Sequence, residues 1–414
     1  MQEFIDKHFF NLFLFTLFFG VITYGLIGFQ SIDEVCGVIL FIMFLSYLFW
    51  TKDWLINRAF AYTMSAFLFY LCYSFFIGSN TKKAILVDFI IQLKPYLAFF
   101  CVYQLKPFFS KNQKTILHQL SIILWFILFP LGILEVSNNK ILDLTMAHPS
   151  NFASAITALS MIFLFTSENT KKDRILFICM LALGIASGRS KFYGLFIVAT
   201  FVAFYFSNLK NLKLNLKTVL ILLSMVAIMV YVTQEKIALY FLQGIGSGET
   251  NNDLIARFVL YETSGQILVD YFPFGSGFGS FATHASRIYY SPIYEQYGID
   301  GVWGLSRYYS SFIADTYYPS LAQFGFVGVF LFLFFWFYLV RKAYKFFRQT
   351  GDIALIILTI IITGYFAIEN LADASFTSNR GFFFMMLLGV IFSEMKYKEK
   401  AFELESQAKE KPCR

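Results

Sequence analysis

Apolar segments of about 17 to 25 residues recur along most of this chain, and they restrict its fold more than any other feature. A helix of that length crosses the roughly 30 Å hydrocarbon core of a bilayer. Because a spanning helix satisfies its backbone hydrogen bonds internally, the pattern indicates helices rather than a β-barrel. With 58% hydrophobic and only 14% charged residues, the chain has more apolar surface than one soluble core could bury. The sequence therefore predicts an all-α polytopic membrane protein.

The apolar segments predict about twelve transmembrane helices. We expect these helices at residues 9–29, 33–50, 59–78, 84–105, 116–134, 151–167, 174–187, 190–207, 217–234, 320–340, 353–372 and 380–395. No small-residue cleavage site follows the first segment, so we expect it to remain as a membrane helix rather than to be removed as a signal peptide.

The distribution of Lys and Arg predicts which connections face the cytoplasm. If the N-terminus is cytoplasmic, the inside connections and the tail hold most of the basic residues, as the positive-inside rule requires. The expected divisions are nine helices in 1–233, one large extracytoplasmic loop in 234–319, three helices in 320–395 and a cytoplasmic tail in 396–414. Since the basic residues serve as topology signals and no recognition motif accompanies them, we expect no nucleic-acid partner.

Five arginines fall on the outer side and so oppose the general trend. Guanidinium presents a rigid donor fork that matches phosphate, and near an apolar bundle it requires an anion or a carboxylate as partner. These residues are Arg189, Arg257, Arg287, Arg307 and Arg380.

Arg189 lies in "SGRS", between two apolar segments that are too close together for an ordinary exposed loop. The spacing predicts a broken pair of helices with Arg189 near membrane depth, where irregular backbone usually lines a cavity. The alternative is a structural role, either at the membrane interface or in an ion pair with Glu369 or Asp373. His148 precedes a helix that begins near Pro149. It either helps to bind an anion at this helix N-terminus or is simply a polar residue at the end of the helix.

The stretch "DYFPFGSGFGSF" contains Gly275, Gly277 and Gly279. It is not a dinucleotide-binding turn, because Ser280 occupies the position of the third glycine and the stretch lies outside the cytoplasm. We expect either a backbone that approaches a ligand or another helix closely, or a re-entrant turn packed by its phenylalanines. The many tyrosines of this outer loop suit contact with sugars, although aromatic residues are also enriched at membrane interfaces.

Two further expectations concern buried polarity and metals. Lys94 and Asp88 lie in one predicted helix and are expected to form a structural pair rather than part of a transport path, because no repeated series of ionisable residues accompanies them. The five cysteines show neither a disulfide framework nor zinc spacing, and the outer loop has no carboxylate cluster with ligand spacing. We therefore expect no metal and no other cofactor.

Four segments, in this order, carry a resemblance to a known family: "HPSNFA", "SGRS", "ARFVLYETSGQILVDYFPFGSGFGSF" and "DTYYPSLAQFGFVG". Together they resemble the Wzy-type O-antigen and capsule polymerases and their relatives the O-antigen ligases, which are polytopic glycosyltransferases of the GT-C class. The resemblance covers most of the chain and implies a GT-C-like fold.

The resemblance also implies roles for individual residues. Arg189 and Arg257 match the arginines that hold a lipid-linked diphosphate. Where the ligases have a His-Asn pair that supplies the base, this chain has Ala314 and Asp315. The departure favours a polymerase, with Asp315 as a substitute base, unless Asp315 caps the next helix or pairs with Arg307. The residues expected to contact the substrates are His148, Gly277, Gly279, His284, Arg287, Arg307, Tyr317, Tyr318 and Arg380.

The implied reaction transfers a growing glycan from undecaprenyl diphosphate to a sugar hydroxyl of another undecaprenyl-diphosphate-linked repeat unit. It would occur on the outer face of a bacterial inner membrane, without a metal, and polymerases of this type are expected to work with a chain-length regulator. Two alternatives remain open from the sequence. The first is a ligase that uses lipid A core as acceptor, and the second is a transporter of lipid-linked oligosaccharides.

Overall fold

The computed structural model describes residues 2–27, 31–51, 57–137, 140–205 and 252–410. The described residues form helices, helical turns and loops, without a strand among them. The α-helices are α1 (Gln2–Leu17), α2 (Tyr24–Ile27), α3 (Ile32–Thr51), α4 (Arg58–Ile77), α5 (Lys82–Leu105), α6 (Lys111–Ser137), α7 (Ile141–Met146), α8 (Pro149–Thr166), α9 (Lys171–Ala182), α10 (Ser190–Tyr205), α12 (Asn252–Asp270), α13 (His284–Ile288), α14 (Ile293–Gln296), α15 (Gly325–Thr350), α16 (Ala354–Glu369) and α17 (Asn379–Glu410).

Seven helical segments in the described part are long and apolar enough to cross a membrane, and two shorter apolar helices accompany them. This confirms the prediction of an all-α polytopic membrane protein. The seven segments are Gln2–Ile22, Ile32–Thr51, Arg58–Ile77, Lys82–Leu105, Lys111–Ser137, Pro149–Thr166 and Tyr318–Thr350. The predicted helix at 217–234 lies outside the described residues, so a total of twelve spans and the GT-C-like arrangement stay predictions.

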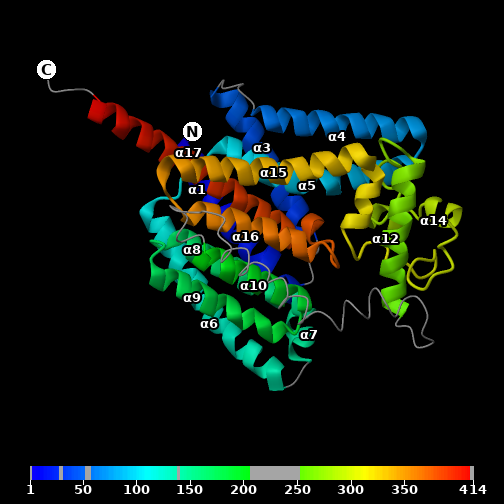
Figure 1. Cartoon of the computed structure of the whole chain (residues 1–414), viewed down its shortest axis with the longest axis horizontal. Helices are drawn as coiled ribbons and strands as arrows, with labels where there is room; N and C mark the ends of the chain where they lie inside the picture. Colours follow the sequence, from blue (N-terminus) through cyan, green and yellow to red (C-terminus); the bar gives the residue numbers. More distant parts are fainter. Residues whose placement is uncertain (1, 28–30, 52–56, 138–139, 206–251, 411–414) are drawn as a thin grey trace, which may run out of the picture.

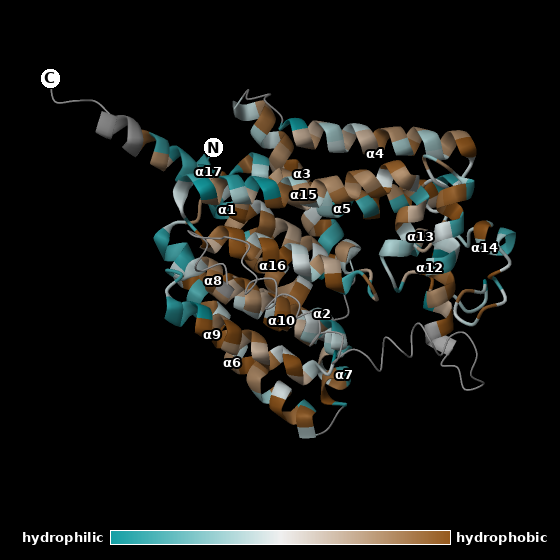
Figure 2. Ribbon diagram, viewed as in Figure 1, coloured by the Kyte–Doolittle hydropathy of each residue, from teal (hydrophilic) through white to brown (hydrophobic). Residues whose placement is uncertain are grey.

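The helix α17 lies inside the bundle and packs against α1, α3, α5, α15 and α16. Its segment from Phe382 to Leu388 is fully buried, which explains why the sequence is apolar on every side of this helix. Figure 2 shows hydrophobic residues along the bundle and hydrophilic residues gathered toward its ends. The central helix therefore fixes the positions of the outer helices around it.

The N-terminus and the C-terminal end of α17 lie at one end of the bundle, and α12 to α14 lie at the opposite end (Figure 1). Residues 252–317 form a cap there with a small hydrophobic core of its own, centred on Phe281 and Tyr294. The cap joins the bundle through the glycine-containing stretch that precedes α13. We call the end with the N-terminus and the C-terminal end of α17 the basic end of the bundle. The opposite end, with α12 to α14, is the cap end.

The glycine-containing stretch is a buried packing turn. Gly275, Gly277 and Gly279 have φ values of 79°, 82° and 70°, a region that suits glycine. Their backbone lies directly against α4, α5 and the start of α15. The backbone N–H groups here donate to protein acceptors: Gly277 to the Gln323 carbonyl (2.8 Å), Phe278 to Ser74 Oγ (2.8 Å), Gly279 to Asp88 Oδ2 (2.8 Å) and Ser280 to Gln323 Oε1 (3.0 Å).

Gly275→Ala should destabilise the protein more than any other substitution in this turn. A Cβ at this position would lie 2.2 Å from the backbone nitrogen of Gly325, and the positive φ costs about 1–2 kcal/mol for other residues. We expect a clear drop in the thermal unfolding midpoint of the purified protein. Gly265→Ala is the matched control, because a Cβ there meets nothing within 4 Å. Equal midpoints for both variants would contradict this account of the turn.

The orientation of the chain can be tested with single cysteines in a cysteine-free background. Tyr308 is 98% exposed in the cap, and Lys172 is exposed at the start of α9, toward the basic end. We expect an impermeant thiol reagent added to intact cells to label Tyr308→Cys and not Lys172→Cys, because the positive-inside rule puts the basic end in the cytoplasm. The reverse labelling pattern would invert the topology.

Candidate functional site

The break between α9 and α10 brings Arg189 to the cap end of the bundle. A short 3₁₀ turn, Leu183–Ser187, extends α9, and Gly188 then takes a left-handed conformation with φ 63°. The next helix begins at Ser190, so Arg189 occupies the junction and is partly buried. The structure therefore confirms the predicted interruption at "SGRS".

His148 lies against Arg189 and caps α8. Its Nδ1 accepts a hydrogen bond from the Ser150 backbone N–H at 3.2 Å, which satisfies one free donor at the helix N-terminus. The Arg189 Nη2 atom contacts both ring nitrogens and lies 3.3 Å from Nδ1. Partial desolvation of the ring and the cationic Arg189 lower the pKa of His148 to about 4. The imidazole is thus neutral near pH 7 and contributes no charge beside the arginine.

Two acidic residues near the end of α16 pair with cations from other helices. Lys191 lies 2.8 Å from Glu369 and 3.4 Å from Asp373, and Arg380 lies 2.6 Å from Asp373. Burial raises the pKa of Asp373, but Arg380 and Lys191 outweigh it and lower that pKa to about 2. Glu369 and Asp373 are therefore not partners of Arg189.

Arg257 and Asp315 form an ion pair within the cap. The Arg257 Nε donates to Asp315 Oδ2 at 2.7 Å, and Nη2 contacts the same oxygen. Burial raises the pKa of Asp315 above its ordinary value, and Arg257 only partly offsets that increase. Asp373 and Lys191 also act on the Asp315 carboxyl, so this pair faces the cluster at the end of α16.

Backbone and hydroxyl contacts hold the cap against the end of α16. The Tyr261 hydroxyl donates to the Leu371 carbonyl at 2.7 Å, and the Tyr318 hydroxyl donates to the Ala367 carbonyl at 3.0 Å. The Tyr317 backbone N–H donates to the Asn370 carbonyl at 3.3 Å. Tyr317 and Tyr318 thus support the helix end, and the hydroxyl of Tyr318 is occupied by the protein.

We call the set of Arg189, Lys191, Arg257, Arg380, His148, Asp315, Glu369 and Asp373 the outer charge cluster. It holds four cations and three carboxylates, and each carboxylate is paired with one of three of these cations, Lys191, Arg257 or Arg380. Among the described residues, Arg189 has no carboxylate within ion-pair distance, and its guanidinium is hydrogen-bonded to the neutral His148. A partly buried guanidinium without a counter-ion favours an anionic ligand at this position.

The small cavity beside Arg380 extends the cluster into the bundle. It has a volume of about 90 Å³ and is lined by Tyr24, Asn151, Ser154 and Arg380, among others. Arg380 Nη1 lies 3.4 Å from Ser154 Oγ at its wall. The cavity therefore offers hydroxyl and amide groups next to the arginine.

The remaining sequence-predicted contact residues lie elsewhere. Arg307 lies 3.5 Å from Glu295 on the cap surface, so it does not pair with Asp315 as the alternative prediction held. Arg287 contacts His284 at 3.2 Å, and burial together with Arg287 lowers the pKa of His284. Gly277 and Gly279 belong to the buried packing turn, which favours the packing alternative for them.

The predicted pairing of Lys94 with Asp88 is wrong. Lys94 pairs with Asp33 and, at 2.8 Å, with Glu34, both at the start of α3. Asp88 instead accepts the Gly279 N–H, because the glycine turn reaches the N-terminal half of α5. Only the packing of α3 and the cap against α5 decides these partners.

Sequence reasoning missed Lys191 as a member of the cluster and named Glu369 and Asp373 only as alternatives for Arg189. The signal available for Lys191 was its position two residues after Arg189, in the first turn of α10.

Neither a scan of protein-family models nor a search of curated proteins finds a match for this chain.

Proposed function

We propose that the protein is a lipid-linked oligosaccharide-dependent polysaccharide polymerase, with the outer charge cluster as its active site. The observation that carries the proposal is Arg189, a partly buried guanidinium at the cap end without a carboxylate partner among the described residues. A diphosphate is an anion whose oxygens match the guanidinium fork, and we propose that Arg257 and Arg380 of the same cluster bind it together with Arg189.

In the proposed glycosyl transfer, Arg189, Arg257 and Asp315 each have a defined role. The acceptor hydroxyl oxygen attacks the anomeric carbon of the donor sugar, and the bond from that carbon to the diphosphate oxygen breaks. Undecaprenyl diphosphate leaves with the electron pair, and Arg189 and Arg257 stabilise the charge that develops on it. Asp315 accepts the proton of the attacking hydroxyl.

The ion pair between Arg257 and Asp315 suits this scheme. When a diphosphate binds, it competes with Asp315 for the guanidinium of Arg257, and the carboxylate is then free to contact the acceptor. The nearby diphosphate also raises the pKa of Asp315 further through like charge, which strengthens it as a base. Binding of the diphosphate would thus engage Arg257 as part of the anion site and release the Asp315 carboxylate to act as the base.

Exposed aromatic side chains of the cap support contact with a glycan. Trp303 and Tyr309 have ring centroids 4.2 Å apart, and Tyr308 projects into solvent. Such rings present apolar faces and hydroxyl groups on which sugars stack. They lie on the same side of the bundle as the outer charge cluster.

The two alternative functions make different demands. A ligase would use the same donor with lipid A core as acceptor, and the absence of a histidine at position 314 or 315 favours a polymerase. A transporter needs a charged path that opens to both sides, whereas the ion pairs of Lys191, Arg257 and Arg380 gather around the cap and the end of α16. The polymerase accounts for both observations.

Reconstitution tests the proposal directly. The full chain, placed in liposomes with a synthetic repeat unit on undecaprenyl diphosphate, should produce a ladder of longer glycans on a gel. The ladder should form without added nucleotide sugar and should be lost in the Arg189→Gln variant. If repeat units with several different sugar compositions all stay unextended by folded protein, the polymerase proposal fails.

A further inference from the structure

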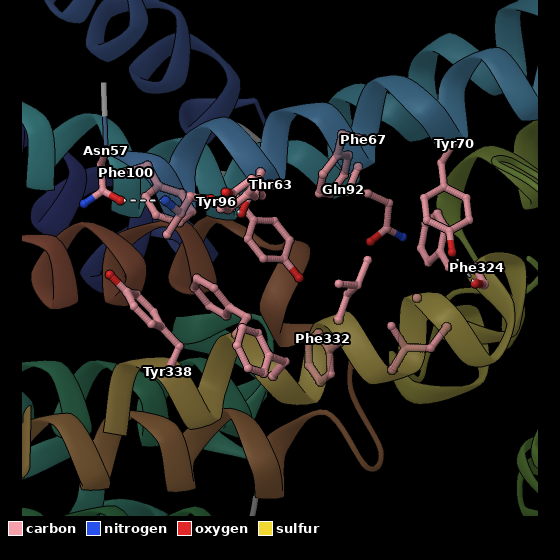
Figure 3. Close-up of a pocket in the computed structure, with 18 of the residues that line it drawn as sticks. Asn57, Thr63, Phe67, Tyr70, Gln92, Tyr96, Phe100, Phe324, Phe332 and Tyr338 are labelled. Carbon is pink, nitrogen blue, oxygen red and sulfur yellow. Dashed lines mark hydrogen bonds between the residues drawn. The ribbon is translucent and has the colours of Figure 1, made fainter. Parts of the chain in front are cut away.

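A large apolar cavity lies between α4, α5 and α15, and none of the residues of the outer charge cluster lines it. Its volume is about 640 Å³, and its walls include Phe67, Tyr96, Phe100, Phe332 and Phe335. Figure 3 shows Asn57 and Tyr338 at one end of it and Tyr70 and Phe324 at the other. From Asn57 to Tyr70 the cavity follows α4 for about 20 Å, which is more than half of the hydrocarbon core.

Direct contacts join the walls of the cavity at its Tyr70 end. The Tyr70 hydroxyl donates to the Phe324 carbonyl at 2.7 Å, and Phe278 of the packing turn lies against Phe324. The other end lies at the start of α4, where Asn57 and Arg58 line it. A ligand head group would therefore lie at the basic end of the bundle, opposite the cap.

Two lysines lie next to this mouth, and the ammonium of Lys342 donates a hydrogen bond to the Tyr103 hydroxyl. Lys342 Nζ lies 5.8 Å from the centre of the Tyr338 ring, which lines the cavity, and 4.4 Å from the Tyr103 ring. Lys396 Nζ lies 3.7 Å from the same Tyr103 ring. Among the described residues, neither lysine has a carboxylate within ion-pair distance, and Glu399 acts on both only at longer range.

Positive charges on Lys342 and Lys396 would repel each other across one aromatic ring, and an anion beside them would favour the charged form of both. The buried side chains of Tyr96 and Tyr317 also line the cavity. Figure 3 shows the Tyr96 hydroxyl and the Gln92 amide directed into the open space. The cavity therefore combines apolar walls, a few polar groups and a cationic mouth, as a lipid site does.

We propose that this cavity binds an anionic glycerophospholipid of the leaflet at the basic end. One acyl chain occupies the cavity, and the phosphate lies near Arg58, Lys342 and Lys396. The lipid fills the space between the outlying helix α4 and the bundle. The proposal is separate from the polymerase reaction, whose lipid substrates carry their diphosphates at the cap end.

Native mass spectrometry of the full chain tests this site, with phosphatidylglycerol as the probe and phosphatidylcholine of the same chains as the comparison. The unaltered protein should retain one phosphatidylglycerol and release phosphatidylcholine. The double variant Lys342→Gln/Lys396→Gln should retain at least tenfold less phosphatidylglycerol. Its matched control is Lys171→Gln/Lys172→Gln, which removes two exposed lysines at the start of α9 and should bind as the parent does.

A second variant fills the cavity and leaves the lysines intact. Ala66→Phe places a ring among the lining residues, whereas Ser65→Phe places it on the exposed face of the same helix. We expect loss of the lipid only with Ala66→Phe, in protein that elutes as folded from a sizing column. Equal retention by these two variants, equal binding of the two lipids, or recovery of a polyprenyl lipid instead would overturn the assignment.

Discussion

Arg189→Lys will lower polymer synthesis by about a hundredfold or more at unchanged protein levels. Lysine keeps the charge but replaces the planar fork with a single ammonium, so it loses the paired hydrogen bonds to a diphosphate. Each lost charge-assisted pair should cost on the order of 2–4 kcal/mol of transition-state stabilisation. The measurement is the initial rate of glycan extension by the purified variant in liposomes. We expect the Arg257→Lys substitution to lower the initial rate of glycan extension by a similar factor.

Arg307→Lys provides the matched control for these two variants. Arg307 is an exposed arginine of the same cap, and it lies near a carboxylate, Glu295, at 3.5 Å. We expect its substitution by lysine to change the rate less than about fivefold, because exposed ion pairs contribute about 1 kcal/mol or less. If Arg189→Lys and Arg257→Lys both extend glycans like the parent, the diphosphate clamp is wrong.

Asp315→Asn will also reduce the rate, by about a hundredfold to ten-thousandfold, if the carboxylate is the base. The amide can still accept a hydrogen bond from Arg257, but it cannot take a proton. Burial raises the pKa of Asp315. As the pH is lowered, the activity of the parent should therefore begin to fall at a higher pH than it would with an aspartate of ordinary pKa. The variant should lose this acidic limb from its pH–rate profile.

A purely structural Asp315 would give a different pattern. In that case Asp315→Asn would lower the unfolding temperature and leave the shape of the pH–rate profile unchanged. Asp315→Glu separates the two roles further, since it keeps a carboxylate and should restore part of the rate under our account. Near-normal extension by Asp315→Asn would move the search for a base to Glu262, His284 or Glu295.

Much of the fold could be predicted from the sequence because membrane helices obey a local rule. Each apolar segment ends where charge or glycine appears, so α3 was expected at 33–50 and lies at Ile32–Thr51. The interruption at Gly188 and the helix start after His148 were likewise readable, since both depend on neighbouring residues. Arg189 could therefore be expected at the cap end.

The partners of the charged residues could not be predicted, because they come from helices distant in the sequence. Lys191 meets Glu369 and Asp373 across α10 and α16, and Arg257 meets Asp315 within the cap. The glycine turn shows the same limit. From the sequence, its glycines are as compatible with ligand binding as with close packing of the backbone. Only the hydrogen-bond acceptors on α4, α5 and the segment before α15 show that the backbone of this turn is packed against the bundle.

The most direct test of the central claim follows the lipid as well as the glycan in the reconstituted reaction. Liposomes with the full chain and a radiolabelled repeat unit on undecaprenyl diphosphate are sampled over time, and both products are counted. Our account predicts that one undecaprenyl diphosphate is released for each new glycosidic bond, while the longer glycans stay on undecaprenyl diphosphate. Transfer of the label to a different lipid, or its movement across the bilayer without any extension, would contradict it.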